Sequence, residues 1–98
     1  MSVNHKLTHV VKDRVVEHFL LNAPELLIRF VDGSTMTVTI AECNSPPLQE
    51  GARIRQISED RATIVIECED ESAFDVTIVD PGNSVSLRDK NNQVEYLG

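Results

Sequence analysis

The chain has 98 residues, and its 16 acidic and nine basic side chains give it a formal net charge of −7. A chain of this length is expected to form a single domain, residues 1–98, with one modest core. Nucleic acids and anionic membranes draw affinity from Lys and Arg contacts. The charge therefore predicts that neither is a partner.

The core must be built mainly of Val, Ile and Leu, because the chain has no Trp, one Tyr and three Phe. That composition favours strands. Cys43 and Cys68 do not form a Cys-x-x-Cys motif, and the start of the sequence lacks the apolar stretch of a signal peptide. No apolar run approaches the roughly 20 residues that span a bilayer. We expect a cytoplasmic protein with reduced thiols.

The first segment, 3–22, has helical periodicity. Apolar side chains recur every four residues, and two more widen the stripe. They are Leu7, Val11, Val15, Phe19, Val16 and Leu20. This spacing predicts an amphipathic helix over 3–22, although the pairs Val10-Val11 and Val15-Val16 are β-branched and lower helix propensity.

The next segment, 25–41, alternates between apolar and other residues on both sides of Asp32-Gly33. Period-two alternation around Asp-Gly predicts a β-hairpin. The face expected to be core consists of Leu26, Ile28, Phe30, Met36, Val38 and Ile40. The opposite face carries Thr35, Thr37 and Thr39.

The second half begins with a loop over 42–51, where Pro46-Pro47 excludes regular structure. Short strands separated by turns follow over 52–97, which predicts a β-meander. Ile54 and Ile57 are three residues apart, so we expect either a bulge near Gln56 or an early end of the strand.

These elements predict a mostly β (α+β) fold, with an N-terminal helix packed on a curled antiparallel meander of six to seven short strands. A small sheet must protect its edges. Closure into a small SH3-like or Sm-like barrel, with the helix across one opening, is therefore favoured over an open sheet.

No set of residues predicts catalysis, a metal or a cofactor. His5, His9 and Asp13 have helical spacing but lack the framework of a metal site. The carboxylates around the turn after Cys68 lack the spacing of a calcium loop, so a solvated turn is expected there. They are Glu67, Glu69, Asp70, Glu71 and Asp75. Only His18 and Glu17, with Asp13, remain as weak acid–base candidates. We expect a protein that is not an enzyme.

The predicted function is therefore a small acidic protein-interaction module that self-associates as a homodimer. Unpaired strand edges and surplus apolar surface would supply the contact. The possible partner surface comprises Val10, Val16, Leu20, Leu21, Thr35, Thr37 and Thr39. The alternative is a small apolar ligand held between helix and sheet by Met36, Phe30 and Phe74.

Overall fold

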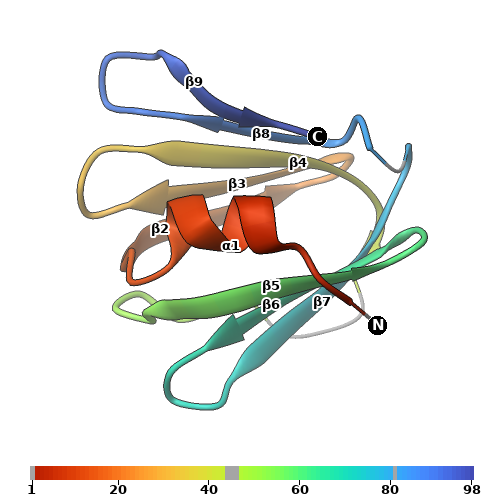
Figure 1. Cartoon of the computed structure of the whole chain (residues 1–98), viewed down its shortest axis with the longest axis horizontal. Helices are drawn as coiled ribbons and strands as arrows, with labels where there is room; N and C mark the ends of the chain where they lie inside the picture. The colour runs from red at the N-terminus through yellow and green to blue at the C-terminus, as the bar shows by residue number, and fades with distance from the viewer. Residues whose placement is uncertain (1, 44–46, 81) are drawn as a thin grey trace.

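The computed structural model describes residues 2–43, 47–80 and 82–98. It shows a mostly β protein in which one short helix lies across the opening of a curled antiparallel sheet (Figure 1). This half-barrel confirms the predicted fold class. The elements are β1 (Ser2–Val3), α1 (His5–Val11), β2 (Val16–Asn22), β3 (Glu25–Phe30), β4 (Thr35–Cys43), β5 (Ile54–Asp60), β6 (Thr63–Cys68), β7 (Ala73–Ile78), β8 (Val85–Arg88) and β9 (Val94–Leu97).

The helix is shorter than predicted, because only His5–Val11 of the segment 3–22 is helical. The chain turns at Asp13, whose φ is 71°, and continues as β2 along β3. β-Branched Val15 and Val16 favour extended backbone, and the edge of β3 supplies hydrogen-bond partners. β1, which begins one residue before this segment, and β2 raise the number of strands in the described residues to nine.

The sheet has two arms that share β4. One arm contains β2, β3, β8 and β9, and the other contains β1, β5, β6 and β7. The first half of β4 pairs with β3 on one side and β8 on the other, while its second half pairs with β7. A register shift between Ile40 and Glu42 marks the change from one arm to the other. The segment 52–97 is therefore not a simple meander: β5, β6 and β7 pair in sequence, but β8 pairs with β4 instead of β7.

The loop predicted over 42–51 starts later, because β4 continues through Cys43. Residues 44–46, including Pro46 of the predicted Pro-Pro break, lie outside the described residues. Beyond them, Leu48 is only 7% exposed and belongs to the core. Further along, a register shift between Ile54 and Gln56 confirms the predicted bulge.

Helix α1 closes one opening by hydrogen bonding to β5. The Thr8 hydroxyl donates to the Ile57 carbonyl (3.2 Å) and accepts from the Ile57 amide (2.9 Å). The side chain of Asn4 caps the helix by accepting from the Leu7 amide at 3.0 Å. After the C-terminal end of the helix, the Val16 amide donates to the carbonyl of Ala52 at 2.8 Å, which joins the start of β2 to the approach to β5.

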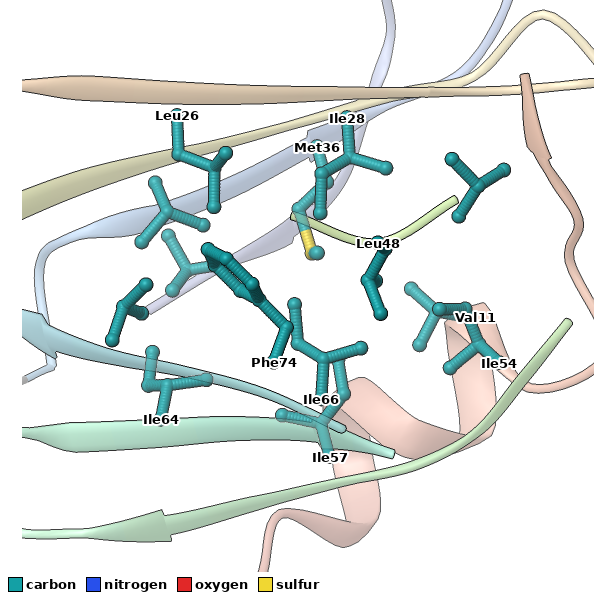
Figure 2. Close-up of a cluster of buried hydrophobic side chains, with 14 of the residues drawn as sticks. Val11, Leu26, Ile28, Met36, Leu48, Ile54, Ile57, Ile64, Ile66 and Phe74 are labelled. Atoms are coloured by element: carbon teal, nitrogen blue, oxygen red, sulfur yellow. The ribbon is translucent and has the colours of Figure 1, made fainter. Parts of the chain in front are cut away.

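The core lies between the two arms (Figure 2). Side chains from β3 and β4 point toward those from β5, β6 and β7, and Val11 of α1 packs at one end. The apolar face predicted for the hairpin is confirmed, since none of its six side chains is more than 4% exposed. The curled sheet thus leaves the opposite face of β3 and β4 as part of the molecular surface.

The turn of the hairpin is ordered by Asp32 and Gly33. The Gly33 amide donates to the Phe30 carbonyl at 3.0 Å, and Gly33 has a φ of +91°. The Asp32 carboxylate accepts from the Ser34 amide at 2.9 Å. Partial burial raises the pKa of Asp32. The hydrogen bonds that its carboxylate accepts from the hydroxyl and the amide of Ser34, together with the charge of Arg14, outweigh burial, so the pKa lies below its usual value.

Candidate interaction surface

Strand β2 forms an edge of the sheet. It pairs with β3 on one side, and no described residue pairs with the other side of Phe19–Asn22. Two large apolar side chains on this strand reach solvent, since Leu20 is 60% exposed and Leu21 is 45% exposed. A long strand edge with exposed apolar side chains is a template for pairing with another strand.

The backbone hydrogen bonds show which residues of β2 face the unoccupied side. Phe30 donates its amide to Ser34, within the hairpin, whereas Val31 donates to Val15, toward β2. Peptide groups alternate in direction along an antiparallel strand. Leu20, opposite Leu27, therefore directs its N–H and C=O toward β3. Phe19 and Leu21 direct theirs outward, where a second strand can reach them.

The outer face of β2, β3, β4, β8 and β9 carries two parallel rows of side chains. Direct cross-strand neighbours make up each row. The basic row is His18, Arg29, Thr35 and Arg88. The apolar row is Leu20, Leu27, Thr37, Ser86 and Leu97.

The basic row borders a shallow depression of about 330 Å³. Arg29 and Arg88 flank Thr35 from the two adjacent strands, and Lys90 joins them from the turn after β8. The sequence alone does not place these cations together, because the pairing of β8 with β4 depends on tertiary structure. The only signal was that Arg29 shares the face of Thr35 in the predicted hairpin.

A second depression, which we call the threonine groove, has a volume of about 200 Å³. It is lined by Thr37, Thr39, Ser86 and Leu97 among others. The three threonines are half-buried and line this groove or the basic one. The structure thus brings Thr35, Thr37 and Thr39 to one outer face.

The other residues of the predicted partner surface are distributed differently. Leu20 and Leu21 are exposed on β2, whereas Val10 is partly buried against the core. Val16 is only 1% exposed. Its inclusion was wrong, because it lies inside the sheet and not on the outer side of a long helix.

The residues considered for chemistry do not form a site. Among the described residues, no group of three or more His, Cys, Asp or Glu side chains could hold a metal ion. His9 lies on α1, but Asp13 falls beyond its end. His18 lies on the surface within 3.6 Å of Glu17 and 3.7 Å of Glu50. These are contacts between exposed side chains at the molecular surface.

The two cysteines occupy different environments. Cys43 is exposed at the end of β4, and Cys68 is buried on β6. Burial raises the pKa of the Cys68 thiol, against a lowering contribution from a hydrogen bond with Ser72. A raised pKa keeps Cys68 protonated, which is the opposite of what a nucleophilic cysteine needs.

The residues expected to line an apolar ligand pocket instead fill the core. Met36 is 1% exposed, and Phe30 and Phe74 are fully buried. Phe74 also contacts Phe19 edge to face, with ring centroids 4.8 Å apart. None of these side chains lines the basic depression, the threonine groove or a third depression beside Leu48.

Comparison with known proteins adds no relationship: no family model, no curated protein and no solved structure matches the chain. Within the part of the chain that the structure describes, no helix has the length and apolar character needed to cross a membrane.

Proposed function

We propose that this protein is an interaction module that forms a homodimer by antiparallel pairing of β2 with β2 of a second copy. The observation that carries the proposal is the unoccupied edge of Phe19–Asn22, with Leu20 and Leu21 exposed beside it. Strand addition satisfies the outward backbone groups of the edge and buries these apolar side chains.

A twofold axis beside Leu20 gives the best register. Phe19 then lies opposite Leu21 of the second copy, and the outward peptide groups of these two residues form a hydrogen-bonded pair. Leu20 meets its own counterpart on the outer face in a close, non-hydrogen-bonded pair. His18 lies opposite Asn22, so no like charges face each other directly. Sliding the axis toward Val16 would bring the second strand against residues 51–52, which already pair there.

The other sheet edges are better covered. β9 has four residues, and its outer side is contacted by Arg14 through Glu95 and by Asn4 through Tyr96. β5 is flanked by β1 and by α1. Among the described strands, β2 therefore offers the longest uncovered edge, and we place the dimer contact there.

Size-exclusion chromatography with light scattering tests this proposal. We expect the unmodified protein to have the mass of two chains at high protein concentration and Leu20→Lys to have the mass of one. Two lysines would meet at the twofold axis, where like charges oppose pairing. Val79→Lys is the matched control, because Val79 is 58% exposed outside β2, and this variant should remain dimeric.

Circular dichroism would verify that both variants are folded. A mass of one chain for the unmodified protein would contradict self-association. Equal dimerisation of Leu20→Lys and Val79→Lys would contradict the β2 contact.

We further propose that the protein acts in the cytoplasm. The supporting observation is that Cys68 is a free thiol buried in the core, which suits a reducing compartment.

A further inference from the structure

The basic depression gathers positive charge on a protein whose net charge is −7. The side chains of Arg29, Arg88 and Lys90 are all exposed and line the same concave area. Their grouping follows from the cross-strand register Arg29–Thr35–Arg88. It is therefore fixed by the backbone of three adjacent strands.

These cations are weakly neutralised within the described chain. The Arg88 guanidinium donates to the Asn92 carbonyl at 3.1 Å, and neither Arg88 nor Lys90 forms an ion pair there. Arg29 lies 3.7 Å from Glu17, with both side chains about half exposed, so solvent weakens that pair.

Among the residues that line the depression, Asp89 carries a carboxylate, and backbone amides of its own turn donate hydrogen bonds to it. Its Oδ1 accepts from the Asn91 amide at 2.8 Å and from the Gln93 amide at 2.9 Å. The depression thus presents more positive than negative charge to an incoming group.

The apolar row runs beside the basic row at a fixed distance. Leu27 precedes Arg29 by two residues on β3, as Ser86 precedes Arg88 on β8. Alternate residues of a strand are about 7 Å apart. The side chains on one face of an extended peptide have the same spacing. A peptide that lies along β3 and β4 can therefore place an acidic side chain near Arg29 and Arg88, which are two strands apart, and its next apolar side chain over Leu27.

We propose that this outer face binds an extended segment of a partner protein in which acidic and apolar residues alternate at every second position. Arg29 and Arg88 provide planar guanidinium groups that pair with carboxylates through two parallel hydrogen bonds. Lys90 adds charge at the end of the site, and Thr37 offers a hydroxyl within the apolar row. The site lies within one chain and goes beyond dimerisation, which uses the edge of β2.

The test is a nuclear magnetic resonance titration of the full chain with a synthetic peptide of sequence Glu-Ser-Leu-Ser-Glu-Ser-Leu-Ser. We expect shifts of backbone amides in residues 27–29, 35–37 and 86–90. Lys90→Glu and Arg88→Glu should each raise the dissociation constant about tenfold, because charge reversal turns attraction into repulsion. A peptide with Lys at both Glu positions should leave these amides unshifted.

Lys6→Glu is the matched control, because it makes the same change of charge on the exposed side of α1. It should change the dissociation constant less than about twofold. An equal loss in Lys6→Glu and Lys90→Glu would overturn the proposal in favour of overall charge. The absence of shifts, shifts spread over both arms, or identical shifts with inorganic phosphate alone would each overturn the acidic peptide as the ligand.

Discussion

At Gly33, the backbone conformation and the packing both restrict which amino acid can occupy the position. Its φ of +91° favours glycine, and a Cβ built there would lie 2.9 Å from the Cβ of Lys90. The tip of the β3–β4 hairpin therefore packs closely against the turn after β8. Gly33 thereby helps to fix the position of Lys90 beside the basic depression.

We expect Gly33→Ala to lower the free energy of unfolding by about 2–3 kcal/mol, from backbone strain and the close contact together. Gly51→Ala separates the two causes, because Gly51 has a φ of +89° but nothing within 4 Å of the added Cβ. It should cost only about 1–2 kcal/mol. Urea denaturation measures both values, and equal losses would mean that the contact with Lys90 has no energetic consequence.

At the scale of elements, α1 acts as a cover for the edge of β5. The Thr8 hydroxyl accepts from the Ile57 amide and donates to the Ile57 carbonyl, which also accepts from the Asn4 amide. Leu7 and Val11 of the helix are buried in the core. A helix of seven residues is marginal by itself. Its stability must come from these contacts.

Thr8→Val keeps the shape of the side chain but removes both hydrogen bonds with Ile57. We expect a loss of about 1–3 kcal/mol in the free energy of unfolding, because the Ile57 amide is left without its partner. Hydrogen exchange of that amide should also accelerate. Thr63→Val is the control, since Thr63 is also a half-buried threonine but lies on β6, and it should change stability by less than about 0.5 kcal/mol. Equal effects would contradict the proposed role of Thr8.

Elements with a local pattern were predictable from the sequence. The hairpin around Asp32-Gly33 has apolar residues at alternate positions in both strands and residues that favour a turn between them, and the structure confirms it. The bulge near Gln56 was likewise visible in the spacing of Ile54 and Ile57. In both cases the determining residues are neighbours in the chain.

β2 shows why other elements were not predictable. Val11, Val15 and Phe19 satisfy a spacing of four, which a helix explains locally. The chain instead becomes a strand because β3 and residues 51–52 supply backbone partners from elsewhere in the sequence. The basic depression was missed for the same reason, since it depends on β8 lying against β4.

At the scale of the whole molecule, the two arms have unequal edges. α1 and β1 cover the edge of the arm that contains β5, whereas β2 leaves the other arm uncovered beyond Val16. Addition of a second β2 would continue that arm into a sheet shared by two copies. The outer faces of both copies would then lie side by side, with their peptide-binding rows still accessible.

The most direct test is disulfide trapping at the twofold axis. Leu20→Cys, in a Cys43→Ser background, places two sulfurs at a non-hydrogen-bonded pair whose Cα atoms are about 4.5 Å apart, within disulfide range. We expect mild oxidation to convert most of this variant into a covalent dimer, and Val79→Cys in the same background to remain largely a single chain. A Leu20→Cys variant that cross-links no more than Val79→Cys would contradict pairing through β2.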